Sequence, residues 1–191
     1  LAALRQWVRN QWNDGWDMGS LNYIPSWDAR VILSLAPGNR ALGMCTHFAT
    51  TFVQCAQALG YPARAIFRGH ALSEAWSNEH RKWMVMDAGM DPNDRRKSTY
   101  SFERNGVPLN ELEVHQAYFI DKKWDDIVVK ATNISEGTEQ VEAPFVPEDK
   151  RAELFESTRQ LFMPLRSNFV DHREPEEPEH GQGYFKFLGF I

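Results

Sequence analysis

The segment from Cys45 to Asp87 reads CTHFATTFVQCAQALGYPARAIFRGHALSEAWSNEHRKWMVMD, and its hydrophobic period changes once along its length. Up to Leu59 the apolar residues recur at steps of three and four, which is the spacing of one helix face. From Ala63 onward apolar and polar residues alternate, which is typical of strands. Gly60 lies between the two parts and can take the positive φ of a helix C-cap. The segment therefore predicts an α+β fold in which one helix packs on an antiparallel sheet.

The predicted helix begins at a cysteine, one of only two in the chain. Its apolar stripe consists of Cys45, Phe48, Phe52, Cys55 and Leu59. The unpaired N–H groups and the dipole of a helix N-terminus favour a thiolate, the nucleophilic form of cysteine. The second cysteine lies about 15 Å further along the helix, which is too far for a disulfide. We therefore predict a nucleophile at Cys45 and a core residue at Cys55.

Three strands come after the helix and are expected over Ala63–Phe67, His70–Trp76 and Trp83–Asp87. The simplest register of the last two strands centres their turn between Asn78 and Glu79 and places His70 opposite Asp87. Side chains alternate along a strand, so these two residues share one face of the sheet. If the Cys45 helix packs on that face, the imidazole can take the thiol proton and the carboxylate can fix the imidazole tautomer. The segment thus predicts a Cys-His-Asp triad.

Four blocks, in this order, resemble the transglutaminase-like superfamily. They are GMCTHFA at 43–49, ALGYPAR at 58–64, GHALSEAW at 69–76 and KWMVMD at 82–87. In that superfamily a Gly-x-Cys opens the catalytic helix, the catalytic His begins a strand, and a Trp precedes the catalytic Asp by four positions. The resemblance covers residues 1–92. The sequences of these blocks are most similar to the bacterial transglutaminase-like and peptide:N-glycanase branches, although the paired CxxC zinc site of the glycanases is missing.

The resemblance implies a papain-like core, a set of catalytic residues and an oxyanion hole. The implied triad is Cys45, His70 and Asp87. The implied oxyanion donors are the backbone N–H of Cys45 and an indole N–H, for which the candidates are Trp12, Trp16 and Trp27. Stabilising the tetrahedral intermediate requires donors of this kind.

Two further residues are candidates for substrate or oxyanion binding. His47 lies two positions after the cysteine, where it either lines the site or occupies a solvated helix position. Glu74 lies four positions after the histidine, and we expect it to form a salt bridge with Arg64 or Arg68 rather than to act in catalysis.

The expected function is thiol-dependent acyl chemistry on an amide or ester through a Cys45 thioacyl intermediate. Hydrolysis, as in a peptidase or amidase, is favoured slightly over transfer to an amine. The substrate is expected to be a peptide, a protein or a glycoconjugate. Two alternatives stay open: a glycan- or peptide-binding module with a non-catalytic triad, and a carbohydrate-active enzyme that uses Glu74 and Asp87 as acid and base.

Two parts of the chain are distinguished by the sequence. Residues 1–97 are expected to form the transglutaminase-like core, and residues 98–191 an extension that packs on that core or extends it. Asn110 and Glu113 predict a capped helix near 109–119. The acidic, proline-containing stretch over 133–148 is expected to be a linker or a mobile loop.

Composition limits the partners of the chain, which has 191 residues and a formal net charge of -5. This charge and the lack of a basic run give no reason to expect nucleic-acid binding. No apolar stretch reaches the length of a membrane span. The sequence carries no metal-site signature, so we expect neither a metal nor another cofactor. The chain begins with leucine in a helical pattern, so an exported bacterial protein with a trimmed signal segment is one interpretation.

Overall fold

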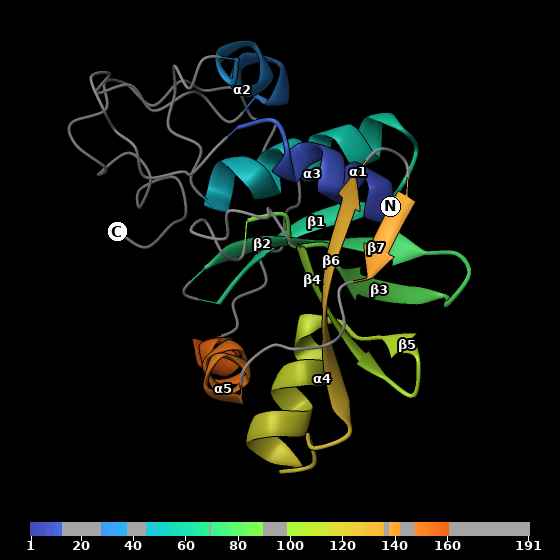
Figure 1. Cartoon of the computed structure of the whole chain (residues 1–191), viewed down its shortest axis with the longest axis vertical. Coiled ribbons are helices and arrows are strands. Elements are labelled where there is room, and N and C mark those ends of the chain that lie inside the picture. The colour runs from blue at the N-terminus through green and yellow to red at the C-terminus, as the bar shows by residue number, and fades with distance from the viewer. Residues whose placement is uncertain are drawn as a thin grey trace, which may run out of the picture.

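The computed structural model describes residues 1–12, 28–37, 45–68, 70–89, 99–135, 138–141 and 148–160. Its helices and antiparallel sheets confirm the predicted α+β class (Figure 1). The helical elements are α1 (Ala2–Arg9), α2 (Ala29–Leu35), α3 (Cys45–Ala58), α4 (Glu111–His115), a π-helical turn (Gln116–Ile120), α5 (Glu148–Glu156) and a 3-10 turn (Ser157–Gln160). The strands are β1 (Ala63–Phe67), β2 (Ala71–Ser77), β3 (Lys82–Val85), β4 (Thr99–Arg104), β5 (Val107–Pro108), β6 (Ile127–Ser135) and β7 (Thr138–Val141).

Two antiparallel sheets organise the described residues. The first has the order β1-β2-β3 and the second the order β5-β4-β6-β7. In Figure 1, α1, α2 and α3 lie above the strands of the first sheet, and α4 and α5 lie below them. A backbone bridge between Asp87 and Tyr100 joins the end of the first sheet to β4. Within the described residues, no helix combines the length and apolar character that a membrane crossing requires.

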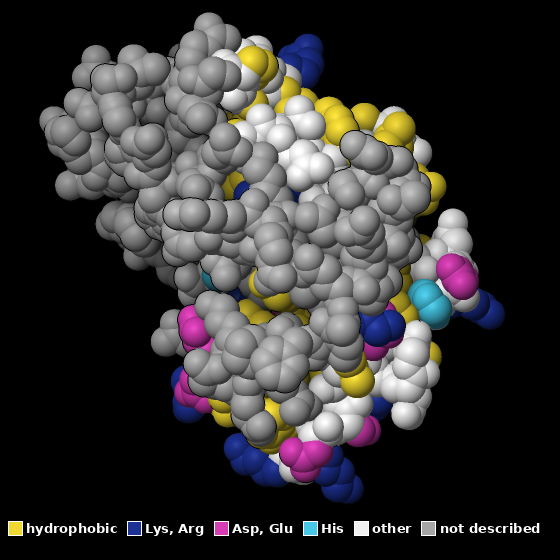
Figure 2. All heavy atoms as spheres, viewed as in Figure 1, with side chains coloured by type: hydrophobic (Ala, Val, Ile, Leu, Met, Phe, Trp, Pro, Cys, Tyr) yellow, Lys and Arg dark blue, Asp and Glu magenta, His cyan; other side chains and the backbone are white. Residues whose placement is uncertain are grey.

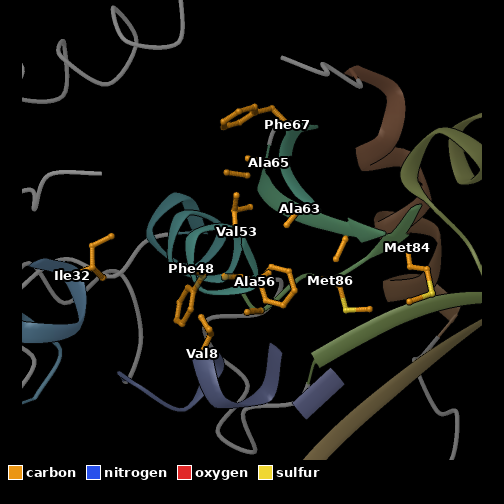
Figure 3. Packing of buried hydrophobic residues seen from close by; sticks show 14 of the residues in the cluster. Val8, Ile32, Phe48, Val53, Ala56, Ala63, Ala65, Phe67, Met84 and Met86 are labelled. Carbon is orange, nitrogen blue, oxygen red and sulfur yellow. The ribbon is translucent and has the colours of Figure 1, made fainter. Parts of the chain in front are cut away.

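Helix α3 is the centre of the first hydrophobic cluster. Phe48, Phe52, Val53 and Ala56 on its buried face meet Val8 of α1 and a row of small residues on the sheet (Figure 3). That row consists of Ala63, Ala65, Ala71 and Ala75. Alanines let a helix approach a sheet closely, because they present one carbon beyond the backbone. The small residues of β1 and β2 therefore determine where α3 sits.

The predicted apolar stripe of α3 holds at its beginning and fails at its end. Phe48 and Phe52 are buried, but Leu59 is 65% exposed and Cys55 is half-buried. The helix ends at Ala58, and Gly60 then takes a φ of +86°, as the predicted C-cap requires. Leu59 lies beyond the last helical turn, so it is no longer part of the buried face.

The β2–β3 hairpin pairs in a register shifted by two residues from the prediction. Glu74 faces Val85 and Trp76 faces Trp83, so the predicted pairing of His70 directly with Asp87 is wrong. The turn between the strands covers residues 78–81, and Arg81 takes a φ of +53° in it. A shift of two residues keeps every side chain on its predicted face, because the side-chain period of a strand is two.

The predicted packing of α3 on the His70 face of the hairpin is also wrong. Leu72 and Val85, which lie on that face, belong to the second hydrophobic cluster together with Phe102 and Phe155. Helix α3 covers the opposite face of the sheet, the one that carries the small residues. Both faces of β2 are buried, so the alternation of polar and apolar residues does not tell which face the helix covers.

The described residues between 99 and 160 form the second layer and share a core with the first sheet. Val85 donates its backbone N–H to the carbonyl of Leu109 at 3.2 Å, directly before α4. The predicted capping box is confirmed: the Asn110 side chain accepts from the N–H of Glu113, and the Glu113 carboxylate accepts from the N–H of Asn110. These bonds fix the direction in which α4 leaves the sheet.

The described residues of the stretch over 133–148 belong to a strand hairpin and to the start of α5 rather than to a linker. Strand β6 runs to Ser135, β7 covers Thr138–Val141, and the two strands pair antiparallel. Strand β6 also pairs with β4 along residues 127–132. The ladder is formed by backbone groups, so an acidic composition does not prevent it.

The burial of α3 generates a prediction about stability. Replacing Phe52, which is fully buried, by alanine should lower the free energy of unfolding by about 3–5 kcal/mol, because it removes a large apolar side chain from a packed core. Leu59→Ala, directly after the same helix, is the matched control and should change the free energy by less than about 0.5 kcal/mol. Urea unfolding of the two variants measures both values. Equal losses would contradict the described end of the buried face.

Candidate active site

Cys45 is the first residue of α3 and is half-buried at the edge of the first hydrophobic cluster. Its Sγ lies 3.9 Å from the Oγ1 of Thr46, the next residue in the helix. The preceding residues, including Gly43 of the predicted motif, lie outside the described part of the chain. The thiol therefore stands at a helix N-terminus, where the backbone dipole favours a negative charge.

His70 and Asp87 meet at the end of the first sheet. His70 directly precedes β2 and Asp87 lies two residues beyond β3. The Nε2 of His70 is 2.9 Å from the Oδ2 of Asp87. The other ring nitrogen, Nδ1, is left for a second partner, and His70 and Cys45 lie close enough for each to shift the pKa of the other. The histidine lies just before the strand rather than within it, which lets it reach a cysteine on the far side of the sheet.

The carboxylate of Asp87 is buried and has three kinds of compensation. Its Oδ1 accepts the backbone N–H of Gly89 at 2.8 Å, and its Oδ2 faces His70. The Nη2 of Arg68 lies 3.9 Å from the same Oδ2. Burial opposes the charged form, but the imidazole, the guanidinium and the amide together hold the pKa of Asp87 below its usual value.

Gly89 couples this carboxylate to the cysteine helix. A Cβ added at Gly89 would come within 2.9 Å of the Phe48 ring, on the first turn of α3. A glycine is needed here because the chain after β3 passes so close to the helix. The segment that carries Asp87 therefore packs directly against the first turn of the helix that carries Cys45.

The three groups shift each other's proton affinity in the direction that nucleophilic chemistry needs. Burial disfavours the Cys45 thiolate, but hydrogen bonding to His70 and the charge of that residue outweigh it and lower the thiol pKa. Burial also disfavours the imidazolium, yet Asp87 and the thiolate raise the pKa of His70 to about 10. Both shifts stabilise the same thiolate–imidazolium pair, which titrates as a unit.

Glu74 occupies a structural position, as predicted. Its Oε2 accepts two hydrogen bonds from Arg64, at 2.8 and 2.6 Å, and its Oε1 accepts the backbone N–H of Glu111 at 2.9 Å. The Arg64 guanidinium also lies 4.2 Å above the Trp83 ring. Both carboxylate oxygens are thus occupied, and the side chain is buried.

The other predicted site residues differ in their placement. His47 is buried on α3, so the solvated helix position considered for it is wrong, and in this structure its side chain has no surface to offer a substrate. Trp12 is buried as well and stacks on Phe48 with ring centroids 4.2 Å apart, which places it in the core behind α3. Trp16 and Trp27 lie outside the described residues.

Arg68 and Glu111 are two buried charged residues beside the site that the sequence did not reveal. The sequence suggests Arg68 only as a partner of Glu74, and Glu111 comes after the predicted N-cap as an ordinary first-turn acid. The local feature that could have indicated Arg68 is its position two residues before the histidine and directly after an apolar strand. Its partner Glu111 lies 43 residues further along the chain, and no local pattern connects them.

Metal binding is not indicated among the residues that the structure describes. None of their His, Cys, Asp and Glu side chains form a group of three or more with the geometry of an ion site.

On the face seen in Figure 2, the described basic side chains are interspersed with acidic ones.

Comparison with protein families matches residues 1–88 to the transglutaminase-like superfamily. This match confirms the resemblance predicted from the four sequence blocks, and its boundary falls directly after Asp87. Members of this superfamily generally use a cysteine for acyl chemistry. Comparison with curated proteins and with solved structures gives no significant match.

The geometry predicts that the two cysteines differ in reactivity. Cys45 should be alkylated by iodoacetamide with an apparent pKa below the free-thiol value of about 8.5, because its pKa is lowered. Cys55 should titrate higher, because burial raises its pKa. In His70→Ala the influence of burial remains without the opposing imidazole, so the apparent pKa of Cys45 should rise. Peptide mass spectrometry across the range in which thiols titrate measures both cysteines in one sample, and equal reactivity would contradict the activated pair.

Proposed function

We propose that this chain is a cysteine-dependent enzyme that performs acyl chemistry on an amide or ester, with Cys45, His70 and Asp87 as its triad. The observation that carries the proposal is the arrangement of a thiol at a helix N-terminus, an imidazole close enough to lower the pKa of that thiol, and a buried carboxylate 2.9 Å from Nε2 of the imidazole. The lowered pKa of the thiol supports a nucleophilic role.

The proposed reaction begins with attack of the Cys45 sulfur on the substrate carbonyl carbon. A C–S bond forms, and the carbonyl electron pair moves to oxygen to give a tetrahedral oxyanion. Collapse of this intermediate breaks the bond to the amine or alcohol, which leaves with the proton of the His70 imidazolium. A water molecule or an amine then attacks the thioester, gives its proton back to His70 and releases the Cys45 thiolate.

The oxyanion is proposed to accept a hydrogen bond from the backbone N–H of Cys45. As the first residue of α3, Cys45 has an N–H that makes no bond within the helix. Such donors need no reorganisation when charge develops on the oxygen. A second donor from Trp16 or Trp27 is proposed on the resemblance alone, whereas Trp12 is engaged in stacking on Phe48.

Hydrolysis is proposed over transfer because water needs no second binding site, whereas an amine acceptor must be held against the thioester. The proposed substrates are peptides, proteins or glycoconjugates that carry an accessible amide or ester. We further propose a papain-like core over residues 1–97, with 98–191 as an extension packed on it. The hydrogen bond between Val85 and Leu109 and the bridge between Asp87 and Tyr100 support this packing.

A carbohydrate-active mechanism with Glu74 and Asp87 as acid and base has less support. A general acid must reach the glycosidic oxygen of its substrate. Both carboxylate oxygens of Glu74 accept hydrogen bonds from protein groups. The side chains of Glu74 and Asp87 are both buried. A binding module with an unused triad has no specific observation in its favour and is treated as an outcome of the test.

The proposed function predicts the effect of removing the sulfur nucleophile. Cys45→Ala should lower turnover of a panel of ester and amide substrates by about a thousandfold or more, because the residues of a triad act as a unit. Cys55→Ala removes the other thiol of the chain and should leave turnover within about twofold. Initial rates with chromogenic esters and peptide amides measure both variants.

Intact-mass spectrometry completes this test by detecting the thioacyl enzyme. A substrate acyl group should add to wild type and to Cys55→Ala, and an added primary amine should divert it to an amide if transfer occurs. Turnover that survives in Cys45→Ala would overturn the proposal. An inert Cys45 with retained peptide or glycan binding would identify a binding module.

A further inference from the structure

Arg68 is a fully buried arginine that contacts the two halves of the chain at once. It comes directly after β1, and its side chain is 1% exposed. Its Nη1 donates to the backbone carbonyl of Leu154 in α5 at 3.0 Å. Its Nε lies 3.4 Å from the Oε1 of Glu111, and its Nη2 lies 3.9 Å from the Oδ2 of Asp87. One guanidinium therefore connects α4, α5 and the carboxylate that faces His70.

We propose that Arg68 is a positioning residue for the active site. Glu111 and α5 hold its guanidinium in place, and the guanidinium in turn orients the carboxylate of Asp87. This inference rests on the proposed function, because it assigns Arg68 a role in orienting Asp87. Arg68 meets the triad at the carboxylate of Asp87, where 3.9 Å separate its Nη2 from Oδ2.

An arginine is suited to this position by its shape and its charge. The guanidinium is planar and carries donors that point in several fixed directions, so it can serve a carbonyl and two carboxylates simultaneously. Burying such a charge is expensive unless acids compensate it. Asp87 and Glu111 supply that compensation, and the positive charge in turn favours ionised Asp87.

Glu111 makes the arrangement sensitive to pH. Its side chain is buried, and neither carboxylate oxygen accepts a hydrogen bond within the described part of the chain. Burial and the charges of Glu74 and Asp87 raise its pKa to about 7, against the opposing effects of Arg68 and His70. Below this pH, protonated Glu111 leaves the charge of Arg68 to Asp87. Above it, the two carboxylates share one guanidinium.

The two residues therefore predict opposite effects on Cys45. Without the positive charge of Arg68, Asp87 is a weaker acid and the nearby thiolate is less stabilised, so Arg68→Gln should shift the apparent pKa of Cys45 upward. Glu111→Gln keeps Arg68 with Asp87 at every pH, so it should increase thiolate reactivity above the pKa of Glu111 and leave it unchanged well below. A purely structural pair would lower stability in both variants without these opposite shifts.

The test measures the rate constant of Cys45 alkylation by iodoacetamide as a function of pH, with Cys55 as the internal reference. For Arg68→Gln we expect an upward shift of about one pH unit, which corresponds to about a tenfold slower reaction at pH values below the apparent pKa. Arg68→Lys keeps the charge without the planar donors and should recover part of the shift. For Glu111→Gln the alkylation rate constant of Cys45 is divided by that of wild type. We expect this ratio to rise about two- to threefold as the pH passes the pKa of Glu111, which is the size of a modest charge effect.

Arg104→Gln is the matched control, because it removes an arginine of the second sheet whose guanidinium bonds to Asp126 and to the carbonyl of Lys123. Its profile should superimpose on that of wild type. Urea unfolding of each variant separates effects on the site from loss of fold. If Arg68→Gln does not fold, Arg68→Lys and Glu111→Gln decide the question. Arg68→Lys keeps the positive charge, and Glu111→Gln keeps the guanidinium beside Asp87.

The outcomes separate this inference from the proposed function. An activated Cys45 in wild type, with profiles unchanged in Arg68→Gln and Glu111→Gln, would overturn the positioning role alone. A wild-type Cys45 no more reactive than Cys55 would overturn both. Opposite shifts in the two variants, with the control unchanged, would establish the positioning role.

Discussion

A carboxylate buried to 1% exposure must be compensated from several sides, and the placement of Asp87 organises much of this structure. Its partners come from separate parts of the chain: the imidazole of His70 before β2, the amide of Gly89 after β3, and the guanidinium of Arg68 after β1. The amide of Gly89 is a local partner, whereas His70 and Arg68 are brought to the carboxylate by the pairing of β1, β2 and β3. The same contacts that neutralise the charge therefore assemble the site.

The position of this carboxylate at the junction of the two sheets has a second consequence. The backbone of Asp87 bridges to Tyr100, and Val85 bonds to Leu109 just before α4. Ile66, Leu72 and Val85 of the first sheet are buried in one cluster with residues of the second half. The family match ends at residue 88, yet residues beyond that boundary cover the face of the first sheet behind the site. The second half is therefore part of the environment in which the site's charges are stabilised.

The sequence predicted the places of the three candidate triad residues in the fold better than the packing around them. Cys45 at a helix start, His70 beside a strand and Asp87 at the end of another came from local period and from the four motif blocks. The hairpin register was wrong by two residues, because the four-residue turn with Arg81 at positive φ has no strong sequence signature. The face covered by α3 was also wrong, since both faces of β2 are buried. Arg68 and Glu111 were missed because long-range pairing between distant charges leaves no local pattern.

The placement of both cysteines on one helix limits the disulfides that Cys45 can form. A thiolate at Cys45 is the form that peroxide converts to a sulfenic acid. Cys55 lies ten residues further along α3, about 15 Å away by helical rise, and both cysteines are free. A rigid helix cannot bring the two sulfurs together, and the chain has no third cysteine to resolve the sulfenic acid as a disulfide. A sulfenic acid at Cys45 would therefore form a disulfide only with a thiol outside these 191 residues.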